Sequence, residues 1–316
     1  MEVFELILPI FAIIVAGMIV GHFKILPEAA GDILIQFAFW VAIPALMFLI
    51  ISRESIDRLL NVGFYVAFGG GSLIVFLAVL FGARHLRKMN LAQASVLALA
   101  TVLSNTAFVA LPILYEVFGH RAVLPAALAI VMTVVVILLG VVLLDQATAT
   151  EDGAGGSVLK TARDGLLNPI VLATVLGIAY AVTGLELPAV AVHFLTPLSE
   201  AVTPCALFAI GMSIRLKALK TGMGEILFAA IVKVIVLPAL ILLLARIMGL
   251  DPIMTIAAVI CAAVPTGKNV FILAGQYNVS KDFAAATISV TSVAAIVTLL
   301  AWLFILAQIY PATVPT

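Results

Sequence analysis

Apolar stretches of about 20 residues recur along this chain and are separated by short polar segments. Of its 316 residues 65% are hydrophobic and 10% are charged, and the mean hydropathy is +1.31. An ordinary soluble domain has about 25% charged residues, and a helix needs about 20 apolar residues to cross a bilayer. The sequence therefore predicts an all-α integral membrane protein with ten transmembrane helices. The ten expected spans are 3–22, 31–51, 62–83, 91–117, 121–145, 166–184, 189–213, 222–246, 252–278 and 282–309.

A polar, glycine-rich segment, "DQATATEDGAGGSVLKTARDG" at 145–165, divides these spans into two groups of five. We therefore expect a first repeat at 1–145, a cytoplasmic linker at 146–165 and a second repeat at 166–316. Because five is odd, the two halves must enter the membrane in opposite directions, which is the condition for an inverted repeat. Two features recur at matching places in the halves: a proline in the second span, Pro44 and Pro204, and polar helix breakers in the fourth.

Lysine and arginine are unevenly shared between alternate loops, and such residues favour the cytoplasmic side. This predicts that both termini lie on the extracellular or periplasmic side of the cell (inner) membrane. The central linker is expected on the cytoplasmic side. The formal net charge is zero, so nothing indicates a nucleic-acid partner. The richer side carries Lys24, Arg84, Arg87, Lys88, Lys160, Arg163, Arg215, Lys217, Lys220 and Lys281, and the other carries Arg53, Arg58, Arg121 and Arg246.

The two fourth spans contain "LSNTAFVALP" (103–112) and "AAVPTGKNVF" (262–271). Pro112 and Pro265 lack a backbone N–H and clash with the carbonyl four residues earlier, so both helices should break near mid-membrane. Unwound backbone is tolerated there only inside protein or beside a wet cavity. Half-helix N-termini that meet at such a point carry positive partial charge, which predicts a site for an anion or a carboxylate.

Lys268 is a full charge inside the second broken span, and such residues are costly and usually functional. Three roles stay open: its ammonium braces the crossed helices, contacts substrate, or takes part in proton coupling. The amides of Asn105 and Asn269 each offer donors and an acceptor. They are expected either to bind substrate or to brace the helix break. The predicted substrate-binding residues are Asn105, Thr106, Pro112, Pro265, Thr266, Gly267, Lys268 and Asn269.

Two further charges fall in or near spans. Lys233 is expected to stabilise helix packing or to snorkel rather than to touch substrate. Glu200, four residues before Pro204, is expected to lie at a wet edge, with titration during transport as the alternative. Cys205 and Cys261 are interpreted as small core residues, and no histidine spacing suggests a metal.

Three short motifs together resemble the auxin efflux carrier family, which includes plant PIN proteins and bacterial carriers of malonate- or malate-type acids. "SNTAFVALPIL" (104–114) resembles its span-4 crossover, "AAVPTGKNVFILAGQY" (262–277) the span-9 partner, and "AIPALMF" (42–48) the span-2 proline motif. By position, Asn105, Pro112 and Pro265 match the family pattern. Lys268 and Asn269 have no match that can be placed, and 62–83 lacks the acidic residue expected there by analogy with the plant carriers.

The resemblance implies a fold similar to that of NhaA-type sodium/proton antiporters and bile-acid symporters, with crossed broken helices 4 and 9. Spans 1, 2, 6 and 7 would form a scaffold, with Pro44 and Pro204 on the scaffold side of the site. Spans 3–5 and 8–10 would form a transport domain that moves like an elevator, and the protein would be a homodimer.

The residues and the resemblance together predict a secondary transporter of a small mono- or dicarboxylate, such as malonate, malate or an auxin-like acid. No cofactor is expected, and coupling to H⁺ or Na⁺ stays open. The alternative is a sodium- or proton-coupled transporter of the bile-acid-symporter or cation/proton-antiporter type, although a cation site would require an acidic residue at the crossover. An enzyme fits less well, because the cluster of Glu116, His120 and Arg121 is better explained as a solvated external turn. A channel fits less well, because the sequence has no repeated rows of polar pore-lining residues.

Overall fold

The structure is a computed structural model that describes residues 2–27, 29–54, 61–148, 163, 167–213 and 222–313. Most of the predicted linker, and the cations Arg58, Lys160, Arg215, Lys217 and Lys220, lie outside these ranges. Every named element in the described part of the chain is a helix. Six helical stretches there are long and apolar enough to cross a membrane, and four shorter apolar helices accompany them. The chain is therefore an all-helical membrane protein, as the sequence predicts.

The helices follow the predicted ranges closely, and four segments are wider π-helical turns inside longer helices. The first half contains α1 (Glu2–His22), α2 (Ala29–Phe37), η1 (Ala38–Ala42), α3 (Ile43–Ile51), α5 (Val62–Phe64), η2 (Tyr65–Gly70), α6 (Gly71–His85), α7 (Leu91–Val102), η3 (Thr106–Ala110), α8 (Leu111–Phe118), η4 (Gly119–Ala122) and α9 (Val123–Thr148). The second half contains α11 (Pro169–Val182), α12 (Ala189–Glu200), α13 (Val202–Ser213), α14 (Met223–Ile231), η5 (Val232–Val236), α15 (Leu237–Ile247), α16 (Pro252–Ala263), α17 (Asn269–Gln276) and α18 (Lys281–Ile309).

Prolines explain where three of the π-helical turns occur. Pro44, Pro112 and Pro238 each stand at the second position of the α-helix that directly follows η1, η3 or η5. A proline offers no N–H to the carbonyl one turn earlier and its ring crowds that carbonyl, so a wider turn accommodates it without ending the helix. The prolines thus deform these spans locally.

Two of the predicted spans are interrupted where the sequence places its helix breakers. Helix α7 ends at Val102 and η3 begins at Thr106, while α16 ends at Ala263 and α17 begins at Asn269. The residues between them, 103–105 and 264–268, are not helical. The two breaks therefore divide each of these spans into an earlier and a later half-helix.

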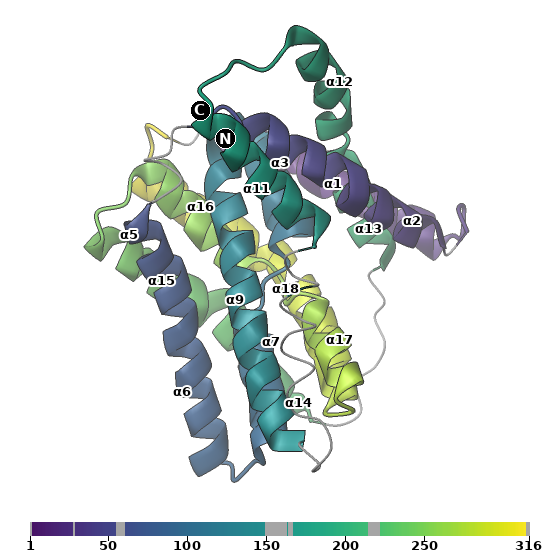
Figure 1. Cartoon of the computed structure of the whole chain (residues 1–316). Helices are drawn as coiled ribbons and strands as arrows, with labels where there is room; N and C mark the ends of the chain where they lie inside the picture. Colours follow the sequence, from purple (N-terminus) through teal and green to yellow (C-terminus); the bar gives the residue numbers. More distant parts are fainter. Residues whose placement is uncertain are drawn as a thin grey trace.

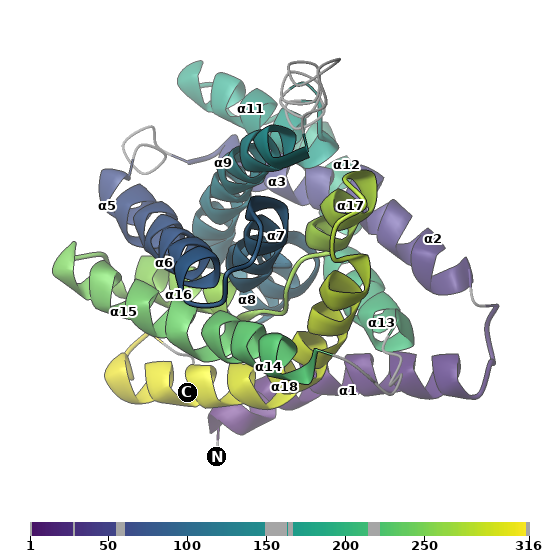
Figure 2. The same ribbon diagram turned by 90° about the horizontal axis from the view of Figure 1, so that it is seen from below.

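Helix α7 is central to one group of helices and packs against α6, α9, α14 and α17 (Figure 2). On another side α1 packs along α13, and α3 packs against α11 and α12 (Figure 1). Glycines allow the closest of these approaches, because a Cβ added at Gly17 would lie 2.1 Å from the carbonyl oxygen of Phe208. Helix α9 extends into the predicted linker by three residues, because it continues to Thr148. Asp145 therefore lies within the helix, and its side chain is buried.

Candidate functional site

The two interruptions meet and pair their backbones. Ser104 and Thr266 form an isolated antiparallel bridge. The backbone nitrogen of Asn105 donates to the carbonyl of Pro265 over 2.9 Å, and that of Gly267 donates to the carbonyl of Leu103 over 2.9 Å. Each unwound segment thus satisfies polar groups of the other, which a buried non-helical backbone requires.

Thr266 fixes the crossing to its surroundings. Its hydroxyl donates to the carbonyl of Ala100 over 2.9 Å, and its backbone nitrogen donates to the hydroxyl of Thr291 over 3.1 Å. The side chain is buried, with 1% of its surface exposed. Thr266, one of the predicted substrate-binding residues, is therefore engaged in holding the crossing together.

Lys233 is the cation that contacts both breaks. It lies in η5, is fully buried, and its Nζ donates to the hydroxyl of Ser104 over 2.9 Å and to the carbonyl of Ala262. The last carbonyls of a helix carry negative partial charge, so an ammonium near the C-terminal ends of α7 and α16 is electrostatically favourable. This bracing role is one of the three that the sequence left open for Lys268, and in the structure Lys233 makes these contacts.

The later half-helices begin at the crossing without side-chain caps. No side chain caps η3, which follows Asn105, or α17, whose N-cap residue is Lys268. By contrast, Asn90 and Asp251 cap the earlier half-helices α7 and α16, with oxygen-to-nitrogen distances of 2.8 and 3.0 Å. Lysine has no acceptor with which to cap a helix. The N-terminal ends of η3 and α17 therefore remain available to a ligand.

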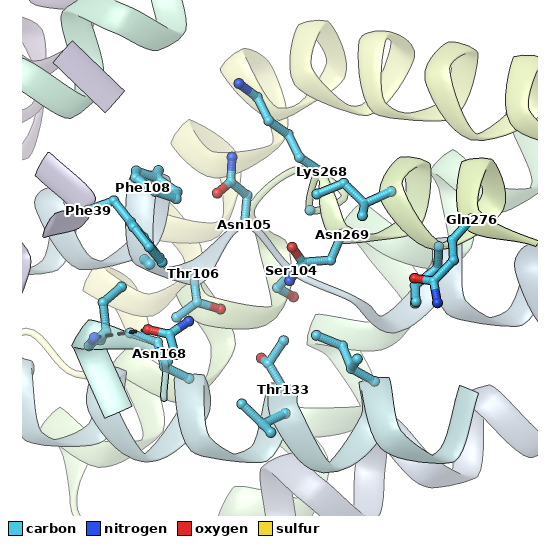
Figure 3. A pocket seen from close by; sticks show the side chains of 18 residues that line it. Phe39, Ser104, Asn105, Thr106, Phe108, Thr133, Asn168, Lys268, Asn269 and Gln276 are labelled. Atoms are coloured by element: carbon cyan, nitrogen blue, oxygen red, sulfur yellow. Dashed lines mark hydrogen bonds between the residues drawn. The ribbon is translucent and has the colours of Figure 1, made fainter. Parts of the chain in front are cut away.

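A cavity of about 370 Å³ opens beside these two N-termini (Figure 3). Ligand pockets commonly measure about 300–1,000 Å³, so a small metabolite fits this volume. Figure 3 shows the side chains of Asn105 and Lys268 extending to the same side of the crossing. Five of the predicted site residues line the cavity: Asn105, Thr106, Gly267, Lys268 and Asn269.

The remaining predicted positions do not line the cavity. Pro265 contributes its carbonyl to the crossing, and Pro112 is buried in α8 beyond the π-helical turn. Pro204 and Glu200 are exposed beside the turn at Ala201, where α12 gives way to α13. Pro44 is the second residue of α3, directly after η1. The residue of η1 that lines the cavity is Phe39. The prolines thus shape the helices that carry the lining without forming it.

Sequence reasoning missed the lining residues that come from other helices. Phe39 and Phe108 stack with ring centroids 6.2 Å apart, and Ile130, Thr133 and Ile137 line the cavity from α9. Their apolar and aromatic character is common to many membrane helices, so no local pattern distinguishes them.

Asn168 was also missed, although it carries a local signal. It stands before Pro169, and its side-chain oxygen caps α11 by accepting from the backbone nitrogen of Ile170 over 2.9 Å. Asparagine followed by proline is a typical helix start, so the cap itself was predictable. Since the oxygen is engaged, the amide nitrogen is the group that Asn168 presents toward the cavity (Figure 3).

The electrostatic character of the cavity is positive. Its described lining residues include one lysine and no aspartate or glutamate, and its asparagines and threonines supply amide and hydroxyl groups. Within the described ranges no group of three or more histidine, cysteine, aspartate or glutamate side chains is placed to hold a metal ion. The arrangement offers hydrogen-bond donors and positive charge beside an apolar wall.

Comparison with known proteins identifies the family. A family model described as "Membrane transport protein" matches residues 2–153 and 156–303. A "Putative malonate transporter" of Rhizobium meliloti is 29% identical over 313 residues, which cover 96% of each chain. "Uncharacterized transporter YfdV" of Escherichia coli K12 is 24% identical over 95% of this chain and 96% of its own. "Auxin efflux carrier component 1" of Arabidopsis thaliana is 29% identical over 127 residues, 38% of this chain and 20% of its own. The chain therefore belongs to the membrane transport protein family that includes the auxin efflux carriers, and its relatives are transporters rather than enzymes.

Proposed function

We propose that this protein is a secondary transporter of a small organic anion, a mono- or dicarboxylate such as malonate or malate. The observation that carries the proposal is the pair of uncapped N-termini, η3 and α17, which open with Lys268 into a cavity whose described lining residues include no acidic one. Helix N-termini and an ammonium both stabilise a carboxylate. A cation site would require acidic oxygen ligands, and none is found among the described residues that line the cavity.

We further propose ten transmembrane spans in two inverted halves of five. The matching interruptions in α7–α8 and α16–α17, and the bridge between Ser104 and Thr266, support a crossing of the fourth and ninth spans. Large apolar side chains on the outside, such as Trp40 (63% exposed) and Phe304 (60% exposed), fit a surrounding bilayer. The lysine and arginine distribution supports an inner-membrane orientation with both termini outside.

An elevator mechanism fits the packing of the helices. We propose that α1, α2, α3, α11, α12 and α13 form a scaffold through which a homodimer assembles, and that the other helices move as one transport domain. Asn168 and Gln276 line the cavity next to loops assigned to the cytoplasmic side. This supports a cavity on the inner side of the crossing, and we propose that the structure corresponds to an inward-facing state.

Uptake into proteoliposomes tests this function. Purified protein is expected to transport labelled malonate or malate, or indole-3-acetate as an auxin-like acid, under an imposed H⁺ or Na⁺ gradient. Because hydrogen bonds to charged groups contribute about 1.5–3 kcal/mol, Lys268→Ala should weaken carboxylate affinity about tenfold or more. Arg246→Ala removes an exposed cation from the far end of α15 and serves as the matched control. Unchanged affinity for every carboxylate in Lys268→Ala would remove the proposed contact.

A further inference from the structure

Asp145 and Lys233 are the two charged side chains that are buried among the described residues. Lys233 has hydrogen-bond partners at the crossing, whereas Asp145 is only half satisfied. Its Oδ1 accepts from the hydroxyl of Tyr277 over 2.5 Å. Its Oδ2 is buried without a hydrogen-bond partner in the part of the chain that the structure describes, and 8% of the residue is exposed. A buried carboxylate oxygen without a donor is costly and calls for an explanation, such as a bound water, ion or proton.

The contact between Asp145 and Tyr277 joins two walls of the cavity. Asp145 lies in the last turn of α9, two helical turns beyond Ile137, which lines the cavity. Tyr277 is the C-cap residue of α17 and directly follows Gln276, another lining residue. Since α17 begins at the crossing and ends at Tyr277, one short helix connects the proposed anion site with Asp145.

The backbone around Asp145 contributes negative partial charge. The carboxylate lies near the C-terminal ends of two helices, its own α9 and α17, where the partial charge of the backbone is negative. Helices α7 and α16 pack on α9; α7 has no ionisable residue and α16 has Cys261. Helix α17 ends at Tyr277, and the loop after it leads to Lys281 and Asp282. Lys281 places its Nζ 5.2 Å from the ring centroid of Phe271.

The loop before α7 adds only exposed cations near this end of the bundle. Arg87 lies 3.8 Å from Glu225, and its neighbour Lys88 is exposed. No ion pair of Asp145 is found within the described ranges. Among the described residues nothing therefore competes for Oδ2, and a bound proton would need no further ligand.

We propose that Asp145 is the proton-binding site that couples H⁺ movement to anion transport. This inference rests on the proposed carboxylate transport. The proton binds to Oδ2 as the anion binds at the N-terminus of α17, and both are released to the same side. Eight residues of α17 separate the two sites by about 12 Å. At an effective dielectric constant of about 20, a charged Asp145 would weaken anion binding about tenfold, so proton and anion stabilise each other.

Asp145→Asn tests the coupling, because the amide keeps the size of the side chain but does not bind and release a proton as a carboxylate does. Labelled malonate is added outside the proteoliposomes, and the outside solution is made more acidic than the lumen. With this pH gradient alone, wild-type protein should accumulate malonate in the lumen. Asp145→Asn should retain malonate exchange but lose accumulation, and its malonate affinity should not vary with pH. Tyr277→Phe keeps the carboxylate and should retain the pH dependence. Accumulation by Asp145→Asn under a pH gradient alone would overturn the proposal.

A second measurement needs no substrate. Infrared difference spectra of the purified protein, taken while the pH is lowered, should show a carboxylic-acid carbonyl band that is absent in Asp145→Asn. Identical spectra for both proteins would overturn the proposal whether or not malonate is transported. If the Asp145 band appears but no carboxylate is transported, the proton site stands and the proposed function fails. The two failures can therefore be distinguished.

Discussion

The backbone nitrogen of Asn105 donates to the carbonyl of Pro265 over 2.9 Å, and this bond joins two helix breaks that lie 160 residues apart in the chain. The crossing has two electrostatically different sides. The C-terminal ends of α7 and α16 are contacted by the buried ammonium of Lys233. The N-terminal ends of η3 and α17 open into the cavity with Lys268. Each lysine thus has its own task, one in holding the crossing and one in the cavity.

Gly267→Ala should disturb the crossing directly. A Cβ at this position would lie 3.1 Å from the carbonyl oxygen of Ser104, and backbone that is held by paired hydrogen bonds cannot easily give way. Overpacking of this kind costs about 1–3 kcal/mol, so the melting temperature in detergent and the malonate uptake should both fall. Gly275→Ala is the matched control on α17, because its Cβ would meet Lys281 at 3.7 Å, an ordinary contact. Equal effects of the two substitutions would contradict this account of the crossing.

Lys233→Met should lower stability without a direct effect on the anion site. The substitution leaves the carbonyl of Ala262 and the hydroxyl of Ser104 without their donor, and each buried unsatisfied group costs about 1–3 kcal/mol. The exposed Lys268 provides the comparison: Lys268→Met should keep the melting temperature but weaken malonate binding. Thermal unfolding in detergent and malonate binding, measured on both variants, check this division. The reverse pattern would mean that the two lysines exchange roles.

Gly17→Ala should separate two helices that contribute no described residue to the cavity lining. Helices α1 and α13 approach so closely that a Cβ at Gly17 would lie 2.1 Å from the carbonyl oxygen of Phe208, and one at Gly211 would lie 2.0 Å from that of Ile14. Because backbone atoms cannot move aside like a side chain, each substitution should lower the melting temperature by more than Gly267→Ala does. Gly82→Ala in α6 meets nothing within 4 Å and should be neutral. Wild-type melting of both Gly17→Ala and Gly211→Ala would refute the close approach.

The helix breaks were predictable because their causes are local. Ser104 and Asn105 mark the first interruption and Pro265 the second, whereas Pro112 accompanies the π-helical turn η3 rather than the break itself; Asn90 and Asp251 mark the capped starts of α7 and α16. These features depend on backbone chemistry within a few residues, which the sequence displays directly.

The contacts that hold the crossing and complete the cavity were not predictable in the same way. Lys233 reaches the crossing from a different helix, and only tertiary packing decides that it, rather than Lys268, contacts both breaks. Phe39 and Asn168 reach the cavity from helices distant in the chain. Asp145 sits at a helix end, where boundaries are uncertain by a few residues, so its burial was not visible from the sequence.

Asn168→Asp should separate helix capping from anion binding. Aspartate still offers an oxygen to the backbone nitrogen of Ile170 and is favourable at a helix N-terminus, so the melting temperature should be unchanged. It replaces the amide nitrogen that faces the cavity with a negatively charged oxygen, which should weaken malonate uptake about tenfold or more through repulsion of the anion. Asn90→Asp makes the same change at the start of α7, away from the cavity lining, and should leave uptake intact. Wild-type uptake by Asn168→Asp, together with unchanged melting, would show that Asn168 only caps α11 and does not contact the transported anion.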